Sequence, residues 1–145
     1  MSNKVEIKFK SLPELESFAR TCVASYSLQL NPSLDEISDI KTAVSEAITN
    51  CIVHAYPKKE GEILLCMEII DDTLKLSITD FGVGIKNIEQ AMTPFYTTKP
   101  EEERSGMGFT VMDSFMDSLT VKNNSSKGLT IEMTKKVSKS SKMVV

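Results

Sequence analysis

Two apolar segments that follow each other directly in the chain constrain the fold more than any other feature. Residues 63–70 (ILLCMEII) are almost wholly apolar, and residues 74–80 (LKLSITD) alternate apolar and polar side chains, as a half-buried strand does. Only a short turn at Asp71-Asp72 separates them, and so short a connection joins antiparallel strands. We therefore expect a hairpin whose first strand is largely buried on both faces.

Two amphipathic helices are predicted before the hairpin, after an alternating strand at residues 5–10. The first helix has Ser11 at its capping position. The second begins with a capping box, in which Ser33 stands three residues before Glu36, and we expect it to run to about Ala55. Helical spacing predicts the apolar faces: Leu15, Phe18, Cys22, Tyr26 and Leu30 in the first helix, and Ile37, Ile40, Val44, Ile48, Cys51 and Ala55 in the second.

The C-terminal half adds further helices and strands. The patterns predict helices near residues 88–92 and 109–115, a polar loop between them, and strands near residues 119–122 and 129–134. Adjacent strands with short turns indicate a mixed, mostly antiparallel sheet, and the amphipathic helices must cover one of its faces. We expect one α+β domain, a two-layer sandwich over residues 1–136, followed by a basic tail at residues 137–145.

Length and charge narrow the possible functions. With 145 residues, 41% of them hydrophobic, the chain can build one compact core, and its net charge of −3 gives no general attraction for nucleic acid. No apolar run approaches the ~20 residues that span a bilayer and no secretory leader is visible, so we expect a cytoplasmic protein that does not enter a membrane. The three cysteines are far apart and predict reduced thiols.

A polar strip is predicted on the second helix, away from its apolar stripe. Glu46, Asn50 and His54 recur every four residues, so a carboxylate and an amide lie one turn, or about 6 Å, apart along the helix axis. Such a pair can serve a binding site, and it is also compatible with an ordinary solvated helix face. For His54, a structural place at the helix end is favoured over a role in the site.

The segment after the second hairpin strand, DFGVGI, combines an acidic residue with two glycines. Asp80 stands at the strand end, where a carboxylate can accept a hydrogen bond from an exocyclic amine such as that of adenine. Gly82 and Gly84 would let the backbone approach a ligand closely, although a simple turn is the alternative. The letters Asp-Phe-Gly do not indicate a eukaryotic-type protein kinase, since the glycine-rich loop, strand lysine and catalytic loop of that fold are missing.

A third segment, RSGMGF at residues 104–109, joins the polar loop to a predicted helix. Free N–H groups and the positive end of the helix dipole would meet there, which makes an anion site suited to phosphates. Lys99 and Arg104 place a cation at each end of a flap-like stretch. The segment is not a Walker A loop, because G-x-x-x-x-G-K-[ST] is absent, and a plain exposed loop is the alternative.

Taken together, the three segments resemble the N, G1 and G2 boxes of the GHKL superfamily, which includes DNA gyrase, histidine kinases and MutL. Their order is E-x-x-x-N on a helix, D-x-G-x-G after a strand and G-x-G after a loop, within residues 35–134. Four segments are similar to the anti-sigma-F factor family of spore-forming bacteria: SEAITN (45–50), PFYTTKPE (94–101), ERSGMGFT (103–110) and FAR (18–20). The resemblance implies an ATP-binding sandwich of the Bergerat type.

The resemblance also implies catalytic roles. Glu46 would act as general base on an incoming serine hydroxyl, and Asn50 would ligate Mg²⁺ together with phosphate oxygens and water. Lys99 and Arg104 would stabilise charge on the transferring phosphoryl group, Arg104 as a catalytic residue. The other implied contacts with ATP are Thr49, Gly82, Gly84, Thr97, Thr98, Ser105, Gly106, Met107, Gly108 and Phe109.

Adenine recognition is implied for the ends of two strands. Asp80 would accept the adenine amine, assisted by the Thr130 hydroxyl. Leu129 departs from the Gly-Thr pair that is usual in the family after the last turn, so Thr130 is expected to supply that hydroxyl.

The implied activity is that of an ATP-dependent protein serine kinase that is also an anti-sigma factor. Such a protein would hold the sporulation sigma factor F, phosphorylate an anti-anti-sigma factor on serine, and act as a homodimer, with Arg20 on the partner-facing surface. One alternative is a nucleotide-gated anti-sigma binding module of a related stress-response system. The ATP domain of a histidine kinase is another, which the single histidine and the short chain argue against.

Overall fold

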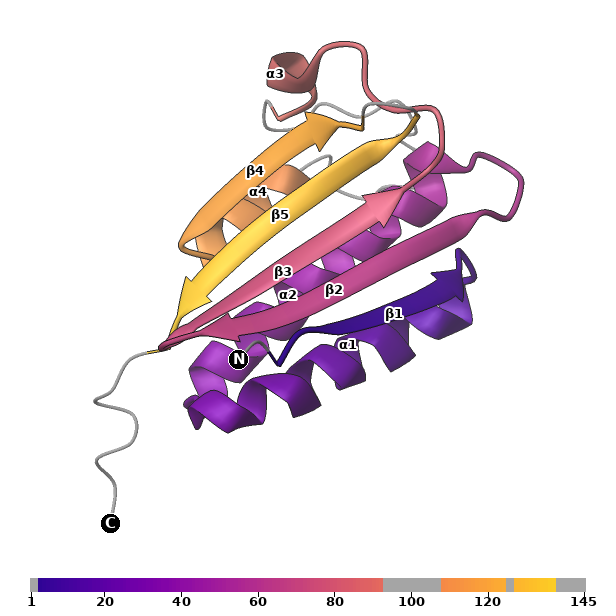
Figure 1. Cartoon of the computed structure of the whole chain (residues 1–145). Coiled ribbons are helices and arrows are strands. Elements are labelled where there is room, and N and C mark those ends of the chain that lie inside the picture. The colour runs from indigo at the N-terminus through magenta and orange to yellow at the C-terminus, as the bar shows by residue number, and fades with distance from the viewer. Residues whose placement is uncertain (1–2, 93–107, 125–126, 138–145) are drawn as a thin grey trace.

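The computed structural model of the protein describes residues 3–92, 108–124 and 127–137 (Figure 1). Within them, a five-stranded sheet in the order β1-β2-β3-β5-β4 has helices packed on one face, and every strand pairing is antiparallel. The predicted two-layer α+β sandwich is therefore confirmed. The strands are β1 (Val5–Lys10), β2 (Glu62–Ile70), β3 (Thr73–Asp80), β4 (Ser118–Asn123) and β5 (Leu129–Lys136). The helices are α1 (Pro13–Ser27), α2 (Leu34–Asn50), α3 (Ile88–Ala91) and α4 (Gly108–Phe115).

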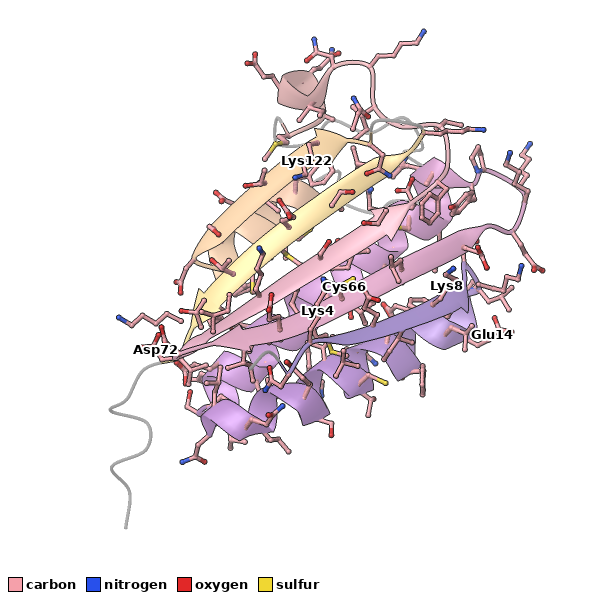
Figure 2. The ribbon with its side chains drawn as sticks, in the orientation of Figure 1. Lys4, Lys8, Glu14, Cys66, Asp72 and Lys122 are labelled. Carbon is pink, nitrogen blue, oxygen red and sulfur yellow. The ribbon has the colours of Figure 1, made fainter. Side chains whose placement is uncertain are left out.

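The hairpin of β2 and β3 forms as predicted, with Asp71 and Asp72 in its turn. On β2, Ile63, Leu65 and Met67 are buried, whereas the residues between them are only half-buried, so the expectation that both faces of this strand are largely buried is wrong for the outer face. The reason is that α1, α2 and α4 all cover the same side of the sheet (Figure 1), and the labelled side chains of Lys8 and Cys66 lie on its other, helix-free side (Figure 2).

The first helix differs from its prediction in cap and in buried face. Its N-cap is Leu12, while Ser11 accepts a hydrogen bond of 2.9 Å from the Gly61 N–H and so ties the end of β1 to the start of β2. The buried side of α1 carries Ala19, Val23 and Ser27, one residue away from Phe18, Cys22 and Tyr26 of the predicted stripe, and Phe18 is 52% exposed. Leu30, just beyond the helix, is buried as predicted. Ala19 and Ser27 are small side chains, which suit close packing, so packing as well as side-chain hydrophobicity selects the buried face.

The second helix begins as predicted. Ser33 Oγ accepts from the Glu36 N–H at 3.1 Å, and Glu36 Oε1 accepts from the Ser33 N–H at 2.9 Å, which completes the capping box. The helix reaches Ala55, but its last turn, Cys51–Ala55, is π-helical. Turns of this kind are rare and frequently lie at functional sites.

The core lies between the sheet and a helical layer in which α2 packs between α1 and α4 (Figure 1). The chain end also contributes, because Val137 is fully buried and its N–H bonds the Asp72 carbonyl at 2.9 Å. Val137, predicted as the first residue of the tail, is therefore part of the core. None of the helices in the described ranges is long and apolar enough to cross a membrane.

Candidate functional site

The helix α2 carries the first part of the candidate site. Its buried face is formed by Ile40, Ala43, Val44, Ala47 and Ile48, which leaves Glu46, Thr49 and Asn50 half-buried at its edge. Glu46 and Asn50 lie one helical turn apart, as predicted. His54 follows within the π-helical turn, where four residues no longer make one α-helical turn, so the α-helical strip ends at Asn50.

Asp80 is the buried acidic group of the site. It ends β3 with its side chain on the helix-facing side and is 1% exposed. Its Oδ1 accepts the backbone N–H of Gly82 at 3.0 Å and that of Leu129 at 3.1 Å. Burial raises the pKa of the Asp80 carboxyl, while these two donors and the Cys51 thiol act in the opposite direction. Since a carboxylate has about four lone-pair positions, it retains acceptor capacity for a ligand N–H group.

Cys51 joins Asp80 to the end of α2. It is fully buried in the π-helical turn, and its thiol shares a hydrogen bond with the Asp80 carboxylate. Burial, and then the neighbouring Asp80 charge, raise the pKa of the Cys51 thiol well above its ordinary value. The thiol therefore stays protonated at neutral pH and acts as a donor to the carboxylate.

The loop after β3 is packed against the end of α2. A Cβ atom on Gly82 would lie 2.1 Å from the Ala55 carbonyl oxygen, and that oxygen accepts the Val83 N–H at 3.2 Å. No side chain fits in this position, which explains why the first glycine of the DFGVGI segment is required.

The β4–β5 connection holds the same loop from the other side. Asn123 accepts the Ile85 N–H at 3.1 Å and donates to the Ile85 carbonyl at 2.9 Å, next to Gly84. Asn124 donates to the Asp80 carbonyl oxygen at 2.8 Å. The backbone from Asp80 to Ile85 is thus fixed on both sides before any ligand binds.

The structure does not place Thr130 beside the Asp80 carboxylate. Thr130 pairs with Thr79 across β5 and β3, and the Thr130 hydroxyl lies 3.2 Å from that of Thr79 and also bonds the Asn124 side chain. Because side chains alternate along a strand, these hydroxyls lie on the helix-free face and Asp80 on the other. The structure therefore does not support direct assistance of the Asp80 carboxylate by the Thr130 hydroxyl. Leu129 occupies the helix-facing position.

The start of α4 completes the described part of the site. Gly108 is its first residue, and Phe109 and Met112 are buried in the core. The helix packs against α2. Phe109 can therefore serve a ligand only through its backbone. Thr97, Thr98, Lys99, Arg104, Ser105, Gly106 and Met107 lie outside the described residues.

Arg20 and Glu46 share a groove between α1 and α2. Arg20 donates to Ser45 Oγ at 3.1 Å and pairs with Glu16 at 3.6 Å. The groove has a volume of about 590 Å³ and is lined by Arg20, Leu34, Ile37, Ser38, Lys41, Thr42, Ser45 and Glu46. The structure thus brings the predicted partner-binding residue and the predicted general base to one surface.

Within the described ranges, no three His, Cys, Asp or Glu residues gather around one point. Protein side chains alone therefore do not form a magnesium site there. Asn50 and Glu46 supply oxygen atoms one turn apart. Mg²⁺ is commonly held by few protein ligands together with phosphates and water, so this donor set fits a metal that arrives with a nucleotide.

Sequence reasoning missed four residues that shape the site. Its spacing places Cys51 in the predicted apolar stripe, and none of the three motifs contains Tyr56, Asn123 or Asn124. Their contacts with residues 80–85 join distant parts of the chain. Only the asparagines carried a signal, because asparagine is common where a turn must satisfy backbone groups.

Comparison with known sequences gives one family over most of the chain. Residues 9–135 match the family described as histidine kinase-like ATPase domain. The chain is 52% identical over 136 residues to an anti-sigma F factor of Clostridium acetobutylicum, covering 94% of this chain and 95% of that protein. It is 47% identical over 141 residues to an anti-sigma F factor of Bacillus velezensis, covering 97% of both.

Solved structures agree on the fold. The RsbU and RsbW domains of Rv1364c from Mycobacterium tuberculosis match with a TM-score of 0.65 and 14% identity, over 92% of this chain and 32% of that chain. The catalytic domain of the histidine kinase ThkA, in a nucleotide-free form, matches with a TM-score of 0.58 and 16% identity, over 92% and 97% of the two chains. From its sequence matches, the chain belongs to the histidine kinase-like ATPase domain family and, within it, to the anti-sigma F factors.

Proposed function

We propose that the protein is an ATP-dependent protein serine kinase that also binds and inhibits sigma factor F. The observation that carries the proposal is the position of Glu46. This carboxylate lies one turn from Asn50 on α2 and also lines the groove that contains Arg20. A general base for a protein substrate needs this arrangement, since it must face the nucleotide on one side and an incoming hydroxyl on the other.

The nucleotide base would be recognised by Asp80. Its buried carboxylate is held by the N–H groups of Gly82 and Leu129, and its remaining lone pairs can accept the exocyclic amine of adenine. The N–H groups that open α4 at Gly108 would face phosphate oxygens. These fixed donors and acceptors require little rearrangement when the nucleotide binds, which favours affinity.

Phosphoryl transfer would take place next to Glu46. The serine oxygen of the substrate attacks the γ-phosphorus of ATP, the bond to the β–γ bridging oxygen breaks, and ADP leaves while Glu46 accepts the serine proton. Asn50 would hold Mg²⁺, which neutralises phosphate charge. Lys99 and Arg104 would stabilise the charge on the transferred group, with Thr97, Thr98, Ser105, Gly106 and Met107 as further nucleotide contacts.

The partners of the proposed kinase are proteins. We infer that the substrate is an anti-anti-sigma factor, that sigma factor F is the inhibited partner, and that the kinase acts in the cytoplasm as a homodimer. The choice of sigma factor is supported by the two relatives compared above, which are both anti-sigma F factors. The groove at Arg20 and Glu46 is the surface on which we expect the substrate serine to arrive.

The proposal is tested by incubating the protein with γ-labelled ATP, Mg²⁺ and the candidate anti-anti-sigma factor. We expect label on a serine of that factor with the wild-type protein and none with Glu46→Gln, while both proteins bind ATP. Retention of sigma factor F on the immobilised protein with ATP present tests the second activity. If the wild-type protein binds ATP and sigma factor F but transfers no label, the protein is a nucleotide-gated binding module and the kinase assignment fails.

A further inference from the structure

Tyr56, the residue that follows the π-helical turn, lies between two strands that it does not belong to. Its side chain is 5% exposed. Its hydroxyl accepts the N–H of Phe81 at 2.6 Å and donates to the carbonyl oxygen of Glu62 at 2.6 Å. One phenol oxygen thus joins the first residue of β2 to the residue directly after β3.

The position of this hydroxyl follows the register of the sheet. The last pair of the β2–β3 ladder is Ile63 with Asp80, so Glu62 and Phe81 would form the next pair. Their backbone groups do not pair with each other, because the Phe81 N–H and the Glu62 carbonyl both bond to Tyr56 instead. The hydroxyl therefore ends the ladder at Asp80 and separates the two strands there.

The separation of the strands has a direct effect on the loop. Directly after Phe81, the chain leaves the sheet and packs against the end of α2, where the Ala55 carbonyl accepts the Val83 N–H. The peptide between Asp80 and Phe81 is held at its nitrogen by Tyr56 and at its oxygen by Asn124. Since that peptide follows the Asp80 Cα and precedes Gly82, its orientation helps to set the direction of the carboxylate, together with the N–H groups of Gly82 and Leu129 that bond to Oδ1.

We propose that Tyr56 is a positioning residue for base recognition: by bridging Phe81 and Glu62, its hydroxyl orients the Asp80 carboxylate towards the amine of the bound base. This inference rests on the proposed function, in which Asp80 reads adenine. Tyr56 need not touch the nucleotide. It acts through the backbone of Phe81, and its contribution is therefore to discrimination between bases and not to the binding of phosphates.

The test compares ATP with inosine triphosphate, which has the same phosphates but a carbonyl in place of the exocyclic amine. Tyr56→Phe keeps the ring and removes only the bridging oxygen. We expect the preference for ATP over inosine triphosphate to fall roughly five- to tenfold, the size of one lost buried hydrogen bond, with little change in the affinity for inosine triphosphate. The amide of Phe81 should exchange with solvent faster in the nucleotide-free variant.

Tyr26→Phe is the matched control, because the Tyr26 hydroxyl also bonds a backbone carbonyl, that of Asn3, at 2.9 Å and lies on α1. It should leave the preference between the two nucleotides unchanged. Equal losses for both nucleotides in Tyr56→Phe, an unchanged preference, or unchanged exchange of the Phe81 amide would each overturn the positioning role while the proposed function stands. A wild-type protein without any preference for ATP would overturn both.

Discussion

The backbone N–H of Leu129 donates a 3.1 Å hydrogen bond to Asp80 Oδ1, although the two residues lie 49 positions apart in the chain. The bond exists because β3 and β5 are antiparallel neighbours, and β5 begins at the edge of the sheet where β3 ends. It also fixes which side chains share a face. Leu129 lies with Asp80 on the helix side, and Thr130 lies with Thr79 on the helix-free side.

This geometry predicts that Thr130→Val leaves nucleotide recognition intact. The variant loses the hydroxyl contacts with Thr79 and Asn124, so the free energy of unfolding should fall by about 1 kcal/mol. Affinities for ATP and inosine triphosphate, measured by calorimetry, should match those of the wild type. A selective loss of ATP affinity would show that the hydroxyl reads adenine after all, through water or a change in the strand.

Asp80→Asn is expected to abolish the preference for ATP while the fold persists. The amide oxygen of asparagine can still accept the Gly82 and Leu129 N–H groups, but its NH₂ group cannot accept the adenine amine. Calorimetric titrations with ATP and inosine triphosphate measure this loss. A variant that keeps the wild-type preference would remove Asp80 from base recognition.

The difference in stability between Asp80→Asn and the wild type should depend on pH. Burial raises the pKa of Asp80 above its ordinary value of 3.8, so the native protein keeps this proton to a higher pH than the unfolded chain does. Ionisation of Asp80 therefore costs stability as the pH rises through the window that begins near 3.8. Urea unfolding at several pH values should show Asp80→Asn gaining on the wild type across that window, with a constant difference above it.

The fold was largely predictable because its main signals are local. The alternation in residues 74–80 and the Ser33–Glu36 capping box act within one strand or one helical turn, and both appear in the structure as expected. The buried face of α1 was misjudged since it depends on how closely two helices approach. Ala19 and Ser27 are buried there and Phe18 is not, which hydrophobicity alone cannot foretell.

The site was predictable only where residue type and spacing carry the chemistry. Glu46, Asn50 and Asp80 could be named from their motifs. The side on which Thr130 lies follows from strand register, and a shift of one residue reverses it. The Tyr56 contacts depend on the π-helical turn, for which the sequence shows no signal.

Asn50→Ala should remove magnesium-dependent nucleotide binding without disturbing the fold. Asn50 is half-buried at the edge of α2, and alanine favours the helix more than asparagine does. We expect the unfolding midpoint to stay within a few degrees of the wild type. Calorimetric titration with ATP should show strong Mg²⁺ dependence only for the wild-type protein, and an unchanged dependence in the variant would contradict the metal role of Asn50.

Gly128→Ala should destabilise the protein and weaken the site together. Gly128 has a φ of 98°, and a Cβ atom there would lie 2.1 Å from the Asp80 carbonyl oxygen. The strain of such a backbone position is about 1–3 kcal/mol, and the clash adds to it. Urea unfolding measures the loss. Ser118→Ala, at the exposed far end of β4, serves as a control and should change stability much less.

Arg20→Ala should weaken the protein partner without affecting ATP. The side chain bonds Ser45 and pairs with Glu16, but it is about one-third exposed, so its removal should cost less than about 1 kcal/mol of stability. An arginine that is a hot spot of an interface costs about 2 kcal/mol or more of binding when it is truncated, over tenfold in affinity. Binding of the anti-anti-sigma factor, measured by surface plasmon resonance, should weaken more than tenfold while the ATP affinity stays constant.

Lys8→Ala removes the same charge from the helix-free face of the sheet (Figure 2) and should leave binding unchanged. Equal effects of the two substitutions would mean that the groove beside Glu46 is not the docking surface.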